Sequence, residues 1–529
     1  MRRFHSYGPV DCEEHFCADR KELIRQCTDQ LIGNPEKEGH YFTVWAPRQT
    51  GKTWLIRQVE QEIGTRYSDK FAVGNMSVQG VMIKDDEPDD AFLDRIPQLF
   101  WEAFEIDMES PPKSWESLKD LFSENKGIFD RPLILFVDEF DSLPPKVIDR
   151  LVTLFRDMYL KRKSYMLHGL ALIGVRAVLG VESHRGSPFN IQRSLHVPNL
   201  SREEVENLYQ QYQDESGQSV EPDVVQAIFE STRGQPGLVC WFGELLTEKY
   251  NPGSDKTLGM KDWRLVWRKA CYVEWNNTIL NLVKKARTDY QEQVLELFTK
   301  AGIPFSLDSE LCSYLYLNGI IDVETHVDEN RKATEICRFS SPFVQERLYN
   351  ALTLDIIGDR MPILVLELLD DLSDVFQKPD PDIPALLERY KDYLKRLKAR
   401  GLNPWKDQPR RTDMHLTEAV GHFHLYAWLK EAVDDFCVVS PEFPTGNGKV
   451  DLHLRCGEKR CIIEVKSFKS LPKAMSARKQ AADYAVSLGL KTVTLALFVP
   501  TEDEDILEKL SGQEVIGGVK VTVSTIGWV

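Results

Sequence analysis

The chain has 529 residues, too many for one hydrophobic core; at roughly 100–200 residues per domain it predicts three or four domains. Its formal net charge of −16 excludes a protein whose whole surface attracts DNA, so any nucleic-acid surface must be a local patch. There is no run of about 18 apolar residues and no signal-peptide core, so we expect no membrane partner and a cytoplasmic location.

The cysteines carry no recognisable metal motif. None of the ten forms a Cys-x-x-Cys pair, and the pairs Cys12/Cys17 and Cys456/Cys461 have no nearby histidine at zinc spacing. We therefore predict reduced structural thiols in a cytoplasmic protein.

Apolar runs that alternate with helical stretches mark the first part of the chain. Residues 41–45 predict a strand, followed by a loop and a helix from Lys52 to about residue 64. Residues 133–137 and 170–175 are further apolar runs of the kind found inside parallel sheets. This order predicts a parallel sheet covered by helices on both faces.

Helical patterns dominate from residue 201 to about residue 250. Ser201 with Glu204 three residues on has the spacing of a helix N-cap. Residues 251–255, Asn-Pro-Gly-Ser-Asp, have the composition of a linker.

Residues 289–350 contain helical stretches and two short strands, 317–323 and 336–340, which resemble the wing strands of a winged-helix module. Residues 361–404 are predicted to be helical, with a basic end. From Arg389 to Arg411 there are nine Lys or Arg against two Asp, which indicates either a phosphate-contacting patch or a solvated helix face. From about Thr412 a helix, three or four strands, another helix and a last strand predict a compact α/β domain.

A nucleotide-binding loop is predicted between the first strand and its helix. The segment fits G-x-x-x-x-G-K-[ST] except that Ala46 replaces the first glycine. Lys52 can reach the β- and γ-phosphates of ATP, and the Thr53 hydroxyl can bind Mg²⁺. The candidate ATP-binding residues are Pro47, Arg48, Gln49, Thr50, Gly51, Lys52 and Thr53.

A second acidic motif follows the strand 133–137. Asp138 can hold the Mg²⁺ water shell, and Glu139 can polarise the attacking water. The alternative is an ordinary surface loop beside an unrelated buried strand. Both motifs occur in the required order, which favours an ATP site.

With these motifs, residues 15–350 resemble the AAA-like ATPases of the STAND-related bacterial and archaeal type. The resemblance rests on four segments: 47–53, 137–141, 173–176 and 232–237. It implies that Arg176 senses the γ-phosphate, that Gly234 and Pro236 belong to a helical lid, and that the protein forms homo-oligomers. Arg176 could equally be a surface arginine, and the Gly-Gln-Pro-Gly segment a helix break.

A candidate metal site lies near the C-terminus. Asp451 lies in an alternating strand, and Glu464 and Lys466 share a face of the next one, so a hairpin would bring Asp451 beside Glu464. Two carboxylates and the Val465 carbonyl suit Mg²⁺ or Mn²⁺, and Lys466 could orient the attacking water. The alternative is a salt-bridged surface strand.

Residues 410–500 resemble the PD-(D/E)XK nuclease superfamily through this strand pair and its flanking helices. The resemblance implies that Glu418 completes the metal shell from outside and that Gln480 and Tyr484 brace the site. Val450 stands where a proline is often found in the superfamily. We do not interpret the nearby histidines as ligands, because positions i and i+2 of a helix face different ways; they are His415, His422, His424 and His453.

We therefore predict an α/β protein: a P-loop ATPase with a lid and a winged-helix-like module, fused to a restriction-endonuclease-like α/β domain. The expected function is ATP-gated, metal-dependent hydrolysis of DNA, with RNA less favoured; the resemblances suggest anti-phage defence. The alternative is an ATP-dependent nucleic-acid-binding switch with an inactive nuclease-like domain. The expected domains are ATPase core 15–200, lid 201–255, winged-helix-like module 256–355, basic connector 356–409 and nuclease-like domain 410–529.

Overall fold

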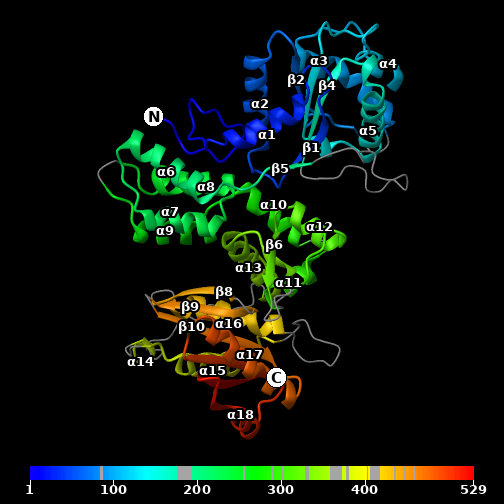
Figure 1. The fold of residues 1–529 in the computed structure, drawn as a ribbon. Coiled ribbons are helices and arrows are strands. Elements are labelled where there is room, and N and C mark those ends of the chain that lie inside the picture. The colour runs from blue at the N-terminus through cyan, green and yellow to red at the C-terminus, as the bar shows by residue number, and fades with distance from the viewer. Residues whose placement is uncertain are drawn as a thin grey trace. The chain divides into compact units, whose positions relative to one another are not determined.

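The computed structural model forms two compact units (Figure 1). The first comprises Met1–Thr278 with Leu317–Gly319, and the second Ile279–Tyr316 with Ile320–Val529. None of the helices in the described ranges is long and apolar enough to cross a membrane. The structure describes residues 1–83, 87–174, 194–253, 256–287, 290–299, 303–327, 333–357, 372–376, 380–401, 403–405, 418–433, 436–445, 448–456 and 459–528.

The first unit contains a sheet of five parallel strands in the order β2-β3-β4-β1-β5. The parallel sheet expected from the apolar runs is confirmed, and the runs at 41–45, 133–137 and 170–175 correspond to β1, β3 and β4. The strands are β1 (Tyr41–Trp45), β2 (Ala72–Ser77), β3 (Leu133–Asp138), β4 (Leu167–Gly174) and β5 (Leu195–His196).

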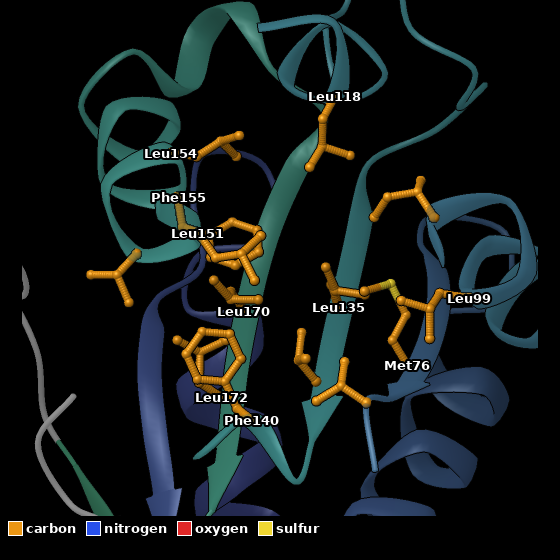
Figure 2. Close-up of a cluster of buried hydrophobic side chains, with 14 of the residues drawn as sticks. Met76, Leu99, Leu118, Leu135, Phe140, Leu151, Leu154, Phe155, Leu170 and Leu172 are labelled. Carbon is orange, nitrogen blue, oxygen red and sulfur yellow. The ribbon is translucent and has the colours of Figure 1, made fainter. Parts of the chain in front are cut away.

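Both faces of this sheet are buried. Along β3, Leu133, Leu135 and Val137 belong to one apolar cluster, and Ile134 and Phe136 to another, because successive side chains of a strand point to opposite faces. Figure 2 shows the first cluster, where helix α5 covers the strands. That face carries α3 (Ile96–Phe104), α4 (Trp115–Asp120) and α5 (Pro145–Leu160); the other carries α1 (Lys21–Ile32) and α2 (Lys52–Arg66).

A group of helices follows the sheet. The predicted N-cap is confirmed, since the Ser201 hydroxyl accepts from the Glu204 N–H (3.1 Å) and the Glu204 carboxylate accepts from the Ser201 N–H (2.7 Å). The elements are α6 (Arg202–Ser216), α7 (Pro222–Thr232), α8 (Pro236–Gly243), the π-helical turn η4 (Glu244–Lys249) and α9 (Met260–Tyr272).

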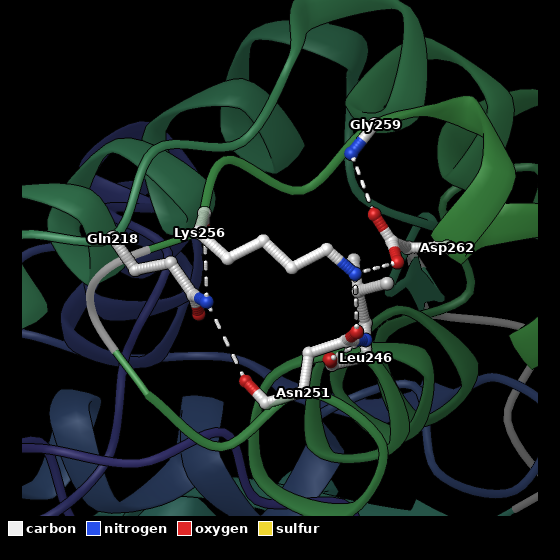
Figure 3. A network of polar contacts seen from close by, with 6 residues as sticks. All are labelled: Gln218, Leu246, Asn251, Lys256, Gly259 and Asp262. Carbon is white, nitrogen blue, oxygen red and sulfur yellow. Dashed lines mark hydrogen bonds and ion pairs between the residues drawn. The ribbon is translucent and has the colours of Figure 1, made fainter.

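The stretch predicted to be a linker lies within this helical group. Figure 3 shows Gln218 donating to the carbonyls of Lys256 (3.1 Å) and Asn251 (3.4 Å), while Lys256 pairs with Asp262 at the start of α9. Helix α9, expected in the winged-helix-like module, packs against η4 and α7. The first unit continues through α9 to Thr278.

Two glycines of this helical group differ in how much space surrounds them, although both have a left-handed backbone. Gly217 (φ 72°) and Gly234 (φ 70°) are both left-handed, but a Cβ on Gly217 meets nothing within 4 Å, whereas one on Gly234 would lie 2.0 Å from the Leu200 carbonyl oxygen. We expect Gly217→Ala to cost about 1–2 kcal/mol of stability and Gly234→Ala to cost clearly more, because backbone must move. Urea unfolding of the full chain measures both, and equal costs would contradict this account.

The second unit begins with helices and a β-hairpin. The predicted wing strands overlap β6 (Ile321–Val327) and β7 (Ala333–Phe339), which pair antiparallel. The helices around and after them are α10 (Asn277–Ala286), α11 (Gln291–Thr299), α12 (Glu310–Leu317), α13 (Pro342–Ile357), α14 (Ser373–Phe376) and α15 (Ile383–Ala399).

The C-terminal part of the second unit is a mixed sheet in the order β12-β13-β11-β10-β9-β8. Strands β8 to β10 are antiparallel, and β10, β11 and β13 are parallel. The strands are β8 (Val438–Thr445), β9 (Gly448–Cys456), β10 (Lys459–Ser467), β11 (Thr492–Val499), β12 (Gly512–Ile516) and β13 (Val519–Gly527); the helices are α16 (Glu418–Val433), α17 (Leu471–Ser487) and α18 (Glu504–Leu510).

The structure contains two disulfides, so the prediction that all the cysteines are reduced is wrong for four of them. Cys12 is bonded to Cys17, and Cys437 to Cys456, while the other six cysteines, all of them among the described residues, are not in disulfides. Val438 pairs with Arg455 across β8 and β9, so the residues just outside that pair, Cys437 and Cys456, lie side by side. The sequence could not show this neighbourhood, which depends on the strand register.

Candidate nucleotide and metal sites

The nucleotide-binding loop joins the carboxyl end of β1 to the first turn of α2. Ala46 is fully buried and continues β1, with its N–H donating to the Gly174 carbonyl (3.4 Å). The loop then turns through two left-handed residues, Gln49 (φ 57°) and Gly51 (φ 91°), and Gly51 directly precedes α2. The sharp turn therefore lies at the end of the loop, and Ala46 can replace a glycine without strain.

Lys52 lies folded back into this loop. Its ammonium donates to the carbonyls of Ala46 (2.9 Å) and Pro47 (2.8 Å). Burial lowers the pKa of Lys52, and the carboxylates of Glu139 and Asp141 oppose that shift. A buried ammonium whose hydrogen bonds are made to loop carbonyls is positioned to exchange those acceptors for phosphate oxygens.

Thr53 and Asp138 bring two hard oxygen ligands together. The Thr53 hydroxyl donates to Oδ2 of Asp138 (3.0 Å), and the backbone N–H of Glu139 donates to Oδ1 (2.9 Å). Hydroxyl and carboxylate oxygens are the ligands that Mg²⁺ prefers, so these residues fit a magnesium ion.

Glu139 follows Asp138 in an unusual backbone conformation. Its φ is 57°, and burial together with the neighbouring Asp138 charge raises the pKa of its carboxyl group. A left-handed non-glycine residue at the end of a buried strand is a strained feature of the kind found at functional sites. A raised pKa suits a group that takes a proton from water near neutral pH.

Asp141 is a further acidic residue whose charge acts on Lys52, and the sequence motifs did not predict it as a site residue. A Cβ on Gly174, the last residue of β4, would lie 2.5 Å from Oδ1 of Asp141, so a side chain at 174 would displace this carboxylate. In the sequence, a glycine at position 174, directly before residues 175–176, was the feature that could have indicated this close approach. The predicted γ-phosphate sensor, Arg176, lies outside the residues that the structure describes.

Helix α8, which belongs to the predicted lid, contacts the loop through its first turn. The side-chain amide of Gln235 donates to the carbonyls of Arg48 (3.1 Å) and Gln49 (3.3 Å), and the Gly237 N–H also donates to Gln49 (3.1 Å). The sequence predicted Gly234 and Pro236 as lid residues, but the side chain that contacts the loop is that of Gln235.

The C-terminal candidate site lies on β9 and β10. Ile463 pairs with Leu452, and one further step of this antiparallel register sets the backbone of Asp451 opposite Glu464. The side chain of Asp451 is outside the described part of the chain. Glu464 is 1% exposed, and a carboxylate so buried needs a cationic partner.

Lys466 is that partner. Its ammonium lies 2.9 Å from Oε1 of Glu464 and 3.1 Å from the Val465 carbonyl oxygen, to which it donates. A carboxylate oxygen and a carbonyl oxygen thus converge on one cation, which is also the donor set of a Mg²⁺ or Mn²⁺ site. Glu464 and the Val465 carbonyl are therefore of a ligand type that suits a divalent metal, but they supply only part of its ligand set.

Two helices cover opposite faces of this sheet. Leu495 pairs with Glu464 and packs with Ala474 and Ala477, so α17 covers the Glu464 face. Gln480 on α17 donates to the Tyr484 hydroxyl (2.5 Å).

Helix α16, which begins at Glu418, covers the other face. A Cβ on its Gly421 would lie 2.8 Å from the ring of Phe498, which pairs with Ser467 in the register and so points away from the Glu464 side. The Glu418 side chain is not among those described. Within the described residues, no group of three or more His, Cys, Asp or Glu could hold a metal ion.

The two α16 histidines are engaged with tyrosines. His422 is hydrogen-bonded to the Tyr349 hydroxyl (2.8 Å) and His424 to the Tyr390 hydroxyl (2.6 Å), each through Nδ1. Both rings are almost completely buried, which agrees with the interpretation that they are not metal ligands. His415 lies outside the described residues.

His424 should make stability depend on pH. Burial lowers its pKa from 6.5 to about 4, so between these values the unfolded state binds a proton that the folded state does not. This contribution is fully present above pH 6.5 and is lost as pH falls, by about 2 kcal/mol at pH 5. Urea unfolding at pH 7.5 and pH 5 should show a smaller loss for His424→Gln than for the wild type; equal losses would contradict the assignment.

The basic helix α15 is largely paired with acidic groups. Arg389 lies 2.9 Å from Asp374, Lys395 lies 3.5 Å from Glu504, and Lys398 pairs with Glu502. Residue 402 and residues 406–411 of the predicted patch are outside the described ranges. For the described part of the patch, a solvated helix face with ion pairs is a better interpretation than a phosphate-contacting surface.

No protein-family model and no curated protein matches the sequence. Solved structures do match: the Walker-type ATPase paby2304 of Pyrococcus abyssi is 17% identical, with a TM-score of 0.45 over 65% of this chain and 99% of that one. The Aeropyrum pernix ORC1 protein in complex with DNA is 14% identical (TM-score 0.31; 64% and 93% covered). The Thermotoga maritima RuvB Holliday junction branch migration motor is 12% identical (TM-score 0.31; 58% and 90% covered). The similarity is one of fold alone.

Proposed function

We propose that the first unit binds and hydrolyses ATP with Mg²⁺. The observation that carries this proposal is the contact between the Thr53 hydroxyl and the Asp138 carboxylate at 3.0 Å. Thr53 lies in the first turn of α2, which the left-handed Gly51 directly precedes. The strand–loop–helix order and the buried Lys52 beside these oxygens support the same function.

Each residue then has a defined task. Lys52 exchanges its loop carbonyls for the β- and γ-phosphate oxygens, and the loop N–H groups face the phosphates. Thr53 and Asp138 would hold Mg²⁺, which would supply positive charge to neutralise the transferred phosphoryl group. Glu139 accepts a proton from the attacking water, and Arg176 is proposed as the γ-phosphate sensor.

For the second unit, we assign a metal-dependent phosphodiesterase centre that acts on DNA in preference to RNA. The observation that favours it is the convergence of Glu464 and the Val465 carbonyl on the Lys466 ammonium. Asp451 and Glu464 would hold the metal, which lowers the pKa of a bound water. Lys466 then orients that water, Gln480 and Tyr484 brace the site, and Glu418 acts from outside the metal shell.

The rival function is an ATP-dependent switch that binds nucleic acid without cutting it. The net charge of −16 favours this reading, because an acidic protein repels DNA outside local patches. The intact set of Asp451, Glu464 and Lys466 favours cleavage. In either function we propose that ATP acts through the helical lid of a homo-oligomer. The two functions differ only in whether phosphodiester bonds break.

Phosphate release from ATP tests the first proposal. The full chain with Mg²⁺ should hydrolyse ATP, and Lys52→Ala should lose both turnover and tight ATP binding. An exposed lysine, Lys126→Ala, serves as the matched control. Turnover by Lys52→Ala equal to that of the wild type would refute the assignment of this loop.

A further inference from the structure

Three lysines near the start of α17 have no acidic partner among the residues that the structure describes. Lys469, Lys473 and Lys479 are exposed, and none forms an ion pair in the part of the chain that the structure describes. They differ in this from the cations of α15 and from Arg478 of the same helix, which lies 3.1 Å from Glu514. The overall charge is strongly negative, so an unpaired basic cluster is a specific local feature.

The helix places these lysines beside the candidate metal site. The apolar face of α17 packs on the sheet face that carries Glu464. Lys473, Ser476 and Gln480 follow one another at i, i+3 and i+7 and therefore lie along one flank of the helix. Lys479 adjoins that flank on the solvent side.

The connection to β10 is short. Lys469 is three residues beyond Lys466, so their Cα atoms are at most about 11 Å apart. The lysines thus extend from the end of the strand that carries the metal site onto the exposed flank of α17. The first carboxylate along this helix, Asp483, comes only after Gln480.

We infer that the DNA backbone lies along the N-terminal half of α17, with Lys469, Lys473 and Lys479 contacting its phosphates and leading a strand to Glu464 and Lys466. This inference rests on the proposed phosphodiesterase function. Lysine contacts to phosphate position the strand without reading its sequence. The surface therefore holds DNA without sequence preference, and α15 does not take part.

The test compares two double variants that remove the same charge. Lys473→Ala with Lys479→Ala removes two unpaired lysines, whereas Lys395→Ala with Lys398→Ala removes two lysines that pair with Glu504 and Glu502. Binding of the full chain to a labelled DNA duplex, the matching single strand and an RNA duplex is measured by fluorescence anisotropy in EDTA at several salt concentrations.

The α17 variant should bind DNA about tenfold more weakly, and the slope of log K against log salt should become shallower by about two, while the α15 variant stays near the wild type. Equal weakening by both variants, or none by the α17 variant, would overturn the inference even if the wild type cleaves DNA. A wild type that binds only RNA, or neither nucleic acid, would also overturn it. ATP hydrolysis, followed in the same preparations, tests the first unit separately.

Discussion

Asp138→Ala should lower the rate of Mg-ATP hydrolysis by on the order of 10²–10³-fold. The substitution removes the acceptor of the Thr53 hydroxyl (3.0 Å) and of the Glu139 N–H (2.9 Å). It therefore removes the proposed magnesium ligand and also a hydrogen bond to the backbone of the left-handed Glu139. The measurement is the steady-state rate of phosphate release at saturating ATP.

Asp130→Ala provides the matched control for this substitution. Asp130 is an exposed carboxylate that pairs with its neighbour Arg131 at the surface, so its loss should leave turnover unchanged. If Asp138→Ala retained turnover within twofold of the wild type, Asp138 would not be a ligand of the catalytic magnesium, and the proposed ATP site would need to be placed elsewhere.

Lys466→Ala should abolish metal-dependent DNA cleavage while leaving ATP binding intact. Lys466 is the cation on which Glu464 Oε1 (2.9 Å) and the Val465 carbonyl (3.1 Å) converge, and it is the group expected to orient the attacking water. The expected loss is at least about 10²-fold, typical for removal of a positioned acid–base or electrostatic group. Plasmid cleavage with Mg²⁺ or Mn²⁺ measures it.

The variant could also weaken folding, because removing one partner of a buried ion pair costs about 3–5 kcal/mol. Lys466→Met retains the packing of the side-chain stem and separates the two effects, with ATP hydrolysis and urea unfolding as checks on the fold. Lys459→Ala, at the exposed start of the same strand, is the matched control. Undiminished cleavage by folded Lys466→Ala would rule out the nuclease centre.

The parallel sheet was predictable because its strands are buried on both faces. Runs such as Leu133–Val137 contain no polar residue, and this pattern depends only on local sequence. The capped helix at Ser201 was predictable for the same reason, since the capping box is complete within four residues.

The features that were missed depend on contacts between distant segments. Gln235 reaches the carbonyls of Arg48 and Gln49 from far along the chain, and no local pattern marks a glutamine for that contact. In the sequence the lysines of α15 form a basic cluster typical of a phosphate-binding patch. In the structure Lys395 pairs with Glu504 and Lys398 with Glu502. The bond between Cys437 and Cys456 likewise requires the strand register.

Some of the site residues could likewise be predicted from local sequence, whereas others depend on contacts between distant segments. The motif around Lys52 and Thr53 is contiguous in sequence. Its partner Asp138 reaches it because β1 and β3 end at the same edge of the parallel sheet. At the C-terminal site, alternation along one strand puts Glu464 and Lys466 on the same face. The relation of Glu418 to that face could not be predicted, because it depends on which side of the sheet α16 covers.

The central claim is that ATP controls a metal-dependent nuclease in one chain. The most direct test is degradation of plasmid and single-stranded DNA with Mg²⁺ or Mn²⁺, with and without ATP, by the wild type, Asp451→Ala and Lys52→Ala. The account predicts that cleavage is lost in Asp451→Ala and that its ATP dependence is lost in Lys52→Ala. DNA binding without cleavage under every condition would contradict the account and favour the switch.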